Sequence, residues 1–206
     1  MPPTFFSYTP FTDPRLCSGT TSRNISFTAL GTELGRPMTQ AEQVHGADSA
    51  VVGATHAGSI VPNVDALITA QRLVPLVIRT ADCAPIFIWD PIRSVIALVH
   101  AGRKGTLLGI TRKTIEHMSS MFDTRPEDCL AAIGPSIGAC CYEIDPVTHE
   151  HFDLIRQNTD QLLTLGMPAG NISAAHICTS CRMDICFSYR KEGKGTGRIY
   201  STLMLI

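Results

Sequence analysis

Short apolar runs separated by polar turns dominate the middle of the chain. Residues 74–80, 85–89 and 94–99 are almost continuously apolar, and the dipeptide Asp90-Pro91 separates the last two runs. Such runs predict strands that are covered on both faces. Six further segments have β-like composition and are also predicted to be strands: 24–30, 49–52, 65–69, 129–133, 172–177 and 199–206.

Helical spacing of apolar residues begins after the third of the long apolar runs. Apolar side chains recur at three- and four-residue intervals over residues 106–122, which predicts an amphipathic helix. Asp145-Pro146 has the character of an N-cap followed by proline at the first helical position, so a second helix is expected to run to about residue 157. A shorter helix over 160–165 is expected to end at Gly166.

The remaining segments predict irregular structure. Residues 1–24 are rich in Pro, Thr and Ser and predict irregular chain with one edge strand, and residues 191–197 predict a mobile loop. No internal repeat or low-complexity linker divides the 206 residues. The mixture of strands and helices therefore predicts a single α/β (mixed α+β) domain over residues 1–206.

Composition narrows the classes of function. The chain has 17 Lys+Arg against 18 Asp+Glu and no basic block, which argues against nucleic acid or an anionic membrane as the main partner. Its apolar runs are too short to cross a bilayer, and its first residues lack the pattern of a signal peptide. We therefore expect a cytoplasmic protein whose eight cysteines are reduced thiols.

Three soft ligands stand at the ends of predicted strands. His45 lies in Gln-Val-His-Gly, Cys83 in Thr-Ala-Asp-Cys, and His100 in Val-His-Ala-Gly. Strand ends of α/β cores are where sites are built, and two imidazoles with one thiolate make a catalytic zinc shell when a fourth position is left open. Taken singly, a histidine beside an apolar segment is more often a structural residue than a ligand, and Cys83 is similarly ambiguous because buried thiols are common.

A second group of cysteines has part of a metal-binding spacing. Cys178 and Cys181 have the two-residue spacing of half a zinc ribbon, and Cys140-Cys141 offers two more thiols. Adjacent cysteines rarely bind one ion together, and the sequence has no second Cys-x-x-Cys. We therefore expect packing or inert thiols here rather than a structural zinc.

The three soft ligands belong to an ordered series of short motifs that resembles the YfiH family, once labelled multicopper polyphenol oxidases or laccase-domain proteins. The resemblance covers residues 40–206, and six ordered motifs at compatible spacing make it specific. The motifs are Gln43-Val44-His45-Gly46, Asp65-Ala66-Leu67-Ile68-Thr69, Thr80-Ala81-Asp82-Cys83-Ala84-Pro85, His100-Ala101-Gly102, Ile133-Gly134-Pro135-Ser136-Ile137-Gly138-Ala139-Cys140-Cys141-Tyr142-Glu143, and the C-terminal set Cys178-Thr179, Phe187-Ser188-Tyr189-Arg190 and Gly197-Arg198.

The resemblance implies a fold, a cofactor and an activity. It implies an αββα-type sandwich related to the catalytic domain of bacterial cytotoxic necrotizing factors, with zinc bound by His45, Cys83 and His100. It implies a purine nucleoside phosphorylase acting on adenosine, inosine, guanosine and methylthioadenosine with phosphate, together with an adenosine deaminase. A separate family role, the editing of peptidoglycan precursors, implies a hydrolase instead.

Further residues in the motifs are candidates for roles in this chemistry. Asp82 is the candidate for moving protons beside Cys83 and His100, and its alternative role is to position a ligand or a loop. Arg190 and Arg198 are candidates for binding phosphate, and their alternative is pairing with carboxylates.

The chain also departs from the family pattern. Arg103-Lys104 stands where the family commonly has tryptophan and arginine, and Ser136 replaces a usual cysteine. Residues 1–39 form an abbreviated and divergent N-terminal segment. These departures bear on the substrate range.

Two other readings remain open. In one, Cys83 is the nucleophile and His100 the base of a metal-free cysteine hydrolase. In the other, the chain is an inactive zinc-binding protein that acts through partners. Copper fits less well than zinc, because a multicopper oxidase needs more histidines than the seven scattered here. The sequence does not set the oligomeric state.

Overall fold

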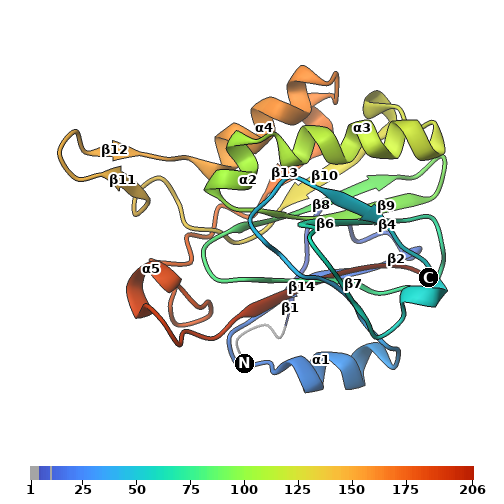
Figure 1. The fold of residues 1–206 in the computed structure, drawn as a ribbon, viewed down its shortest axis with the longest axis horizontal. Helices are drawn as coiled ribbons and strands as arrows, with labels where there is room; N and C mark the ends of the chain where they lie inside the picture. Colours follow the sequence, from blue (N-terminus) through green and yellow to red (C-terminus); the bar gives the residue numbers. More distant parts are fainter. Residues whose placement is uncertain (1–4, 10) are drawn as a thin grey trace.

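The computed structural model describes residues 5–9 and 11–206 and arranges them as two facing β-sheets with helices on the outer faces (Figure 1). The first sheet has the order β1-β2-β14-β7-β3-β5 and the second the order β13-β10-β8-β9-β6-β4. Both contain parallel and antiparallel pairs, so the fold is a mixed α/β fold.

The strands and helices have the following bounds. The first sheet comprises β1 (Phe5–Phe6), β2 (Leu16–Thr21), β3 (Thr39–Ala41), β5 (Ile60–Val61), β7 (Leu76–Thr80) and β14 (Ile199–Leu205). The second comprises β4 (Ser49–Val51), β6 (Ala66–Thr69), β8 (Ala84–Asp90), β9 (Val95–Ala101), β10 (Leu130–Ile133) and β13 (Ile172–Ala174), and β11 (Glu143–Asp145) pairs with β12 (Glu150–His151) as a separate hairpin. The helices are α1 (Phe27–Leu34), α2 (Arg103–Leu107), α3 (Ile110–Phe122), α4 (Leu154–Thr164) and α5 (Tyr189–Glu192), with 3-10 turns at Ala54–His56, Pro126–Asp128 and Ala169–Asn171.

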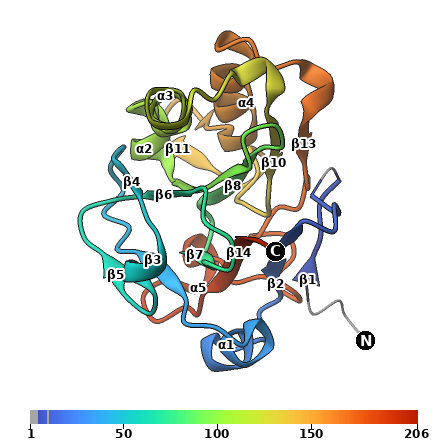
Figure 2. The same ribbon diagram turned by 90° about the vertical axis from the view of Figure 1, so that its right-hand side faces the viewer.

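Helices cover the outer face of each sheet (Figure 2). On the second sheet, α2, α3 and α4 cover the outer face, and α3 buries Ile115 and Met118 against it. On the first sheet, α1 packs through Leu30 against Val77 of β7. The resulting order of layers is helix, sheet, sheet, helices, which is the αββα sandwich that the resemblance implies.

Alternation along the central strands explains their continuous apolar runs. In β8, Ile86 and Ile88 pack toward the helices, whereas Phe87 and Trp89 pack between the two sheets. Because side chains alternate in a strand, a strand buried on both faces needs apolar residues at every position. In β9 the same alternation places His100 on the inter-sheet side, in phase with Ile96 and Leu98.

Several predicted elements differ from the observed ones. Residues 24–30 were predicted as a strand but contribute to helix α1. The Ser26 hydroxyl accepts the Ala29 N–H at 3.1 Å as an N-cap, and Gly35 ends the helix at a left-handed φ of 60°. These caps outweigh the weak alternation of a short segment.

The helix predicted from Asp145-Pro146 to residue 157 is wrong in its first half. The Asp145 carboxylate accepts the N–H groups of Val147 and Thr148, which closes the turn between β11 and β12. Asp and Pro serve turns and N-caps through the same hydrogen bonds, so the local signal is ambiguous. The helix starts instead at the N-cap Asp153 and continues through the segment predicted as a separate helix, with Gly166 (φ 94°) just beyond its end.

The helix predicted over 106–122 is divided in two. Gly109 adopts a left-handed φ of 78° between α2 and α3, so Leu107 and Leu108 are exposed instead of buried. At the N-terminus, β1 is the edge strand that was expected, and β2 is an additional, interior strand paired with β1 and β14. The mostly polar sequence of β2 does not predict a buried strand. Its Thr20 hydroxyl is satisfied by hydrogen bonds with the hydroxyls of Tyr8 and Ser201.

The other predicted strands are confirmed, with small changes of boundary. Residues 1–4 and 10 of the predicted irregular N-terminal segment lie outside the described residues. Within residues 5–9 and 11–206, no helix has both the length and the apolar character that crossing a membrane requires.

Candidate metal centre and its pocket

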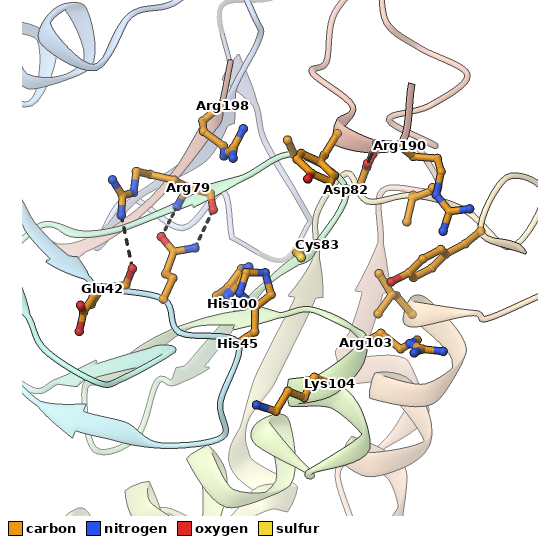
Figure 3. A pocket seen from close by; sticks show the side chains of 16 residues that line it. Glu42, His45, Arg79, Asp82, Cys83, His100, Arg103, Lys104, Arg190 and Arg198 are labelled. Atoms are coloured by element: carbon orange, nitrogen blue, oxygen red, sulfur yellow. Dashed lines mark hydrogen bonds between the residues drawn. The ribbon is translucent and has the colours of Figure 1, made fainter. Parts of the chain in front are cut away.

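His45, Cys83 and His100 meet where the two sheets are joined. His45 lies in the loop after β3, Cys83 lies in the connection from β7 of the first sheet to β8 of the second, and His100 is near the end of β9. Their donor atoms all lie within 4.8 Å of one another, and the centroids of the two imidazole rings are 4.9 Å apart (Figure 3). The structure thus brings together the three residues that the sequence singled out.

Asp65 orients two of these three residues. Its buried carboxylate accepts the backbone N–H of His45 at 2.9 Å and that of Gly46 at 2.7 Å. It also lies 2.7 Å from His100 Nδ1, and a carboxylate there holds the proton on Nδ1. Nε2 of His100 is therefore left to face Cys83 and the cavity. His45 has a left-handed φ of 59°, a conformation that these hydrogen bonds stabilise.

Gly102 provides the space in which the donors approach. A Cβ atom at this position would lie 2.9 Å from Cys83 Sγ and 3.1 Å from His45 Cδ2. Both distances are shorter than ordinary contacts, so a side chain here would displace the donors. The glycine of the His-Ala-Gly motif is explained by this close approach.

Cys83 and His100 stabilise each other in their charged forms. Although burial disfavours its thiolate, the electrostatic attraction of His100 and hydrogen bonds from His100 and His45 lower the pKa of Cys83 to about 6. Burial disfavours the imidazolium of His100, but the Cys83 thiolate and the Asp65 carboxylate raise its pKa to about 9. Without a metal ion, the pair is therefore a thiolate and an imidazolium at neutral pH.

The chemistry of these donors fits a metal ion. Two imidazoles and a thiolate are good ligands for zinc and for copper, and three protein ligands leave a coordination position open. His45 is exposed to the cavity while His100 is buried, so the open side of the set faces the cavity. The three residues therefore form a candidate metal centre.

The cavity beside these donors has a volume of about 800 Å³, within the usual range for small-molecule sites. Basic side chains outnumber acidic ones around it (Figure 3). Such a lining favours an anionic ligand. The lining residues are Glu42, Gln43, His45, Arg79, Ala81, Asp82, Cys83, His100, Arg103, Lys104, Ile137, Tyr142, Leu154, Tyr189, Arg190 and Arg198.

Asp82 holds one wall of this cavity in place. Its carboxylate accepts the Thr179 hydroxyl at 2.6 Å and the Arg190 backbone N–H at 2.7 Å. Asp82 itself has a left-handed φ of 89°, next to Cys83. Both carboxylate oxygens thus bind the C-terminal segment, which favours the positioning role over proton transfer.

Arg190 and Arg198 both line the cavity. Arg190 donates from Nη1 to the Glu143 carbonyl at 2.9 Å and stacks 5.2 Å from the Tyr142 ring centroid. Arg198 donates from Nη1 to the carbonyls of Thr196 and Gly197. Over residues 5–9 and 11–206, neither guanidinium forms a salt bridge with a carboxylate.

Sequence reasoning missed three contributors to the site. Arg79 is the only charged residue of the apolar run 74–80, a signal that was available. Its backbone N–H and C=O are both held by the Gln43 side chain, at 2.9 and 2.6 Å, which gives the first residue of the Gln-Val-His-Gly motif a structural role. Asp65 was recognised within a motif but not as the partner of His100.

Comparisons with known proteins agree with this picture. Residues 19–206 match the family model described as multi-copper polyphenol oxidoreductase laccase, so the resemblance extends further toward the N-terminus than residue 40. A purine nucleoside phosphorylase of Bacteroides thetaiotaomicron is 37% identical over 164 residues, which cover 69% of this chain and 61% of that protein. The chain therefore spans less than two thirds of that relative. The purine nucleoside phosphorylase YlmD of Geobacillus stearothermophilus is 35% identical over 191 residues, covering 77% of this chain and 68% of the relative.

Solved structures share the fold. YlmD from Geobacillus stearothermophilus has a TM-score of 0.88 and 27% identity, with 96% of this chain and 94% of that chain covered. YfiH from Bacillus licheniformis has a TM-score of 0.87 at 24% identity, with 93% of each chain covered. The relation to the cytotoxic necrotizing factors stays a prediction. The matched family model and the relatives together show that this chain belongs to the multi-copper polyphenol oxidoreductase laccase family, which is the YfiH family that its motifs resemble.

Proposed function

We propose that this protein is a zinc-dependent purine nucleoside phosphorylase that also deaminates adenosine. Phosphorolysis joins nucleoside and phosphate to give the free base and the sugar 1-phosphate, which is ribose 1-phosphate or, from methylthioadenosine, 5-methylthioribose 1-phosphate. Deamination joins adenosine and water to give inosine and ammonia. The substrates of the first reaction are adenosine, inosine, guanosine and methylthioadenosine. The names of the relatives support the phosphorylase, and deamination rests on the family resemblance.

One observation carries the proposal. The candidate metal donors and a set of cationic side chains line the same cavity of about 800 Å³. A phosphorylase must hold an uncharged nucleoside and an anion side by side, and Arg190 and Arg198 are available for the anion. Tyr142 and Tyr189 add aromatic surface to the same cavity, suited to a flat purine base.

Zinc would be held by His45, Cys83 and His100. When bound there, it supplies Lewis acidity at the reacting oxygen. The residues of the chain prepare this site: Asp65 fixes the tautomer of His100, and Asp82 positions Arg190 through the backbone. Copper oxidase chemistry is less suited to this cavity, because a multicopper oxidase needs more histidines than His45 and His100, the two that line it.

The direct test is a turnover assay of the purified full chain. Adenosine and inosine are incubated with and without phosphate, and bases, ribose 1-phosphate and ammonia are quantified. We expect base release only with phosphate and ammonia release from adenosine without it. Absence of both products from a zinc-loaded, folded protein would contradict the proposal and favour the binding-protein reading.

A second candidate function is favoured by a specific observation. The lowered pKa of Cys83, with His100 beside it and Asp65 behind His100, is also the arrangement of a cysteine nucleophile with an oriented base. A metal-free cysteine hydrolase, including one that edits peptidoglycan precursors, would use this arrangement. Such an enzyme would keep full activity after chelation and lose it on alkylation of Cys83. The zinc enzyme loses activity on chelation and regains it when zinc is restored.

A further inference from the structure

A second cluster of donors lies outside the pocket. Cys140 and Cys141 belong to the segment between β10 and β11, and Cys178 and Cys181 follow β13. The four sulfur atoms all lie within 4.8 Å of one another. The segments are distant in sequence and meet through the fold.

The spacing of the sulfur atoms matches a single tetrahedral ion. The Sγ–Sγ distances are 3.4 Å for Cys141–Cys181, 3.8 Å for Cys140–Cys141 and 3.9 Å for Cys140–Cys181. Four thiolates at the usual Zn–S distance of about 2.3 Å stand about 3.8 Å apart at the corners of a tetrahedron. Disulfide sulfurs are much closer, at about 2.05 Å.

The backbone of the loop at Gly138 lies close to the sulfur atoms of the cluster. The Gly138 N–H donates to Cys178 Sγ at 3.2 Å. A Cβ on Gly138 would lie 3.2 Å from Cys140 Sγ, so the absence of a side chain there lets the loop approach the sulfurs.

We propose that Cys140, Cys141, Cys178 and Cys181 bind one zinc ion in a closed structural site. Four protein ligands leave no open coordination position, which is the mark of a structural rather than a catalytic zinc. All-sulfur tetrahedral sites select zinc or iron, and a single-ion spacing leaves no room for an iron–sulfur cluster. The objection that adjacent cysteines rarely share an ion is met by the geometry, which turns both sulfurs toward Cys181.

The site would join two segments that build the pocket wall. Cys141 precedes Tyr142, which lines the cavity, and Cys178 precedes Thr179, whose hydroxyl binds Asp82. The two segments are otherwise connected near the cluster by the bridge between Ser136 and Cys178 and a few backbone hydrogen bonds. A zinc ion at this place would therefore stabilise the wall that carries Arg190.

The first measurement is the zinc content of the full chain, purified with a reductant and analysed by elemental mass spectrometry. We expect about one zinc fewer per chain in the double variant Cys178→Ser/Cys181→Ser than in the wild type. Cys17→Ser is the matched control, because Cys17 lies on β2 away from the cluster. Zinc content equal to that of the wild type in the folded double variant would overturn the proposal.

The two zinc sites are distinguished in the Cys83→Ala background. This background removes the pocket ligand, so the zinc that it retains reports on the four-cysteine cluster alone. A failure of the pocket site would leave the difference of about one zinc between this background and its Cys178→Ser/Cys181→Ser derivative unchanged. The proposed function and this proposal therefore fail separately.

Cobalt provides the second readout, and it holds even if the double variant does not fold. Co²⁺ added to the Cys83→Ala protein should give an intense thiolate-to-cobalt charge-transfer band, because four thiolates surround one ion. The single variant Cys140→Ser, at an exposed position, should lower this band to about three quarters, since one of the four thiolates is lost. An unchanged band, or a Cys141–Cys181 disulfide in the zinc-loaded protein, would overturn the proposal.

Discussion

The two clusters of metal donors in this protein are built in contrasting ways. The pocket set combines two imidazoles with one thiolate, lies where two sheets are joined, and depends on the buried carboxylate of Asp65 for its orientation. The four-cysteine set combines identical donors from two surface segments. Three donors leave a coordination position open and suit chemistry, whereas four donors close the coordination shell and suit stability. The contrast separates the two roles within one chain.

The sharpest way to break this comparison is to remove ligands from each cluster in turn, one from the pocket set and two from the four-cysteine set. We expect Cys83→Ala to reduce nucleoside turnover by about a hundredfold or more, because the pocket no longer retains the metal ion. The four-cysteine double variant should instead lower the thermal midpoint by roughly 6–12 °C, as expected for a loss of about 3 kcal/mol from an unbound metal. Turnover assays and calorimetry test the two expectations, and a large loss of activity with no loss of stability in the cysteine variant would erase the distinction.

Asp65→Asn tests whether the pocket set depends on its carboxylate. An amide at this position binds His100 more weakly and no longer carries a charge, so we expect zinc to bind about 10–100-fold more weakly. Competition with a chromophoric chelator measures the affinity. Asp160→Asn, an exposed carboxyl on α4, is the control and should leave the affinity unchanged. Equal affinities for the wild type and Asp65→Asn would show that the donors are oriented by packing alone.

Variants of Arg190 and Arg198 test whether phosphate binding and deamination depend on different residues of the pocket. If Arg190 or Arg198 binds phosphate, its change to Met should lower phosphorolysis about tenfold or more, because a charge-assisted contact contributes on the order of 1.5–3 kcal/mol. Deamination should change far less, since it uses no anion. Paired rates of both reactions are the measurement, with Arg112→Met on α3 as the control. Equal losses in the two reactions would point to nucleoside positioning or folding.

The smallest expected effect is the number of protons that Cys83 and His100 release when zinc binds. Between the pKa of about 6 for Cys83 and about 9 for His100, the metal-free pair holds one proton, on His100. A metal ion replaces that proton, so zinc binding near pH 7.5 should release about one proton from the pair, and about two from it below pH 6. Titration calorimetry in buffers of different ionisation enthalpy measures the release. A pair that releases no proton at pH 7.5 would contradict the thiolate–imidazolium assignment.

The sequence predicts the pocket donors and the central strands better than the elements around them. The strands at 74–80, 85–89 and 94–99 are predictable because a strand that is buried on both faces requires apolar residues at nearly every position. Asp145 failed as a helix signal because turns and caps use the same carboxylate hydrogen bonds. Asp65 and Gln43 were missed as partners because their contacts, 35 and 36 residues away in the chain, depend on strand register, which local patterns do not contain.

The position of Cys83 between β7 and β8 has a consequence for folding. These two strands belong to different sheets, so the three donors come together only after the sheets have docked face to face. An ion bound by them favours the docked state by mass action, by about 4 kcal/mol when its free concentration is a thousand times the dissociation constant. Occupancy of the pocket would then report on assembly of the whole sandwich, and metal supply would shift the balance between undocked and docked sheets.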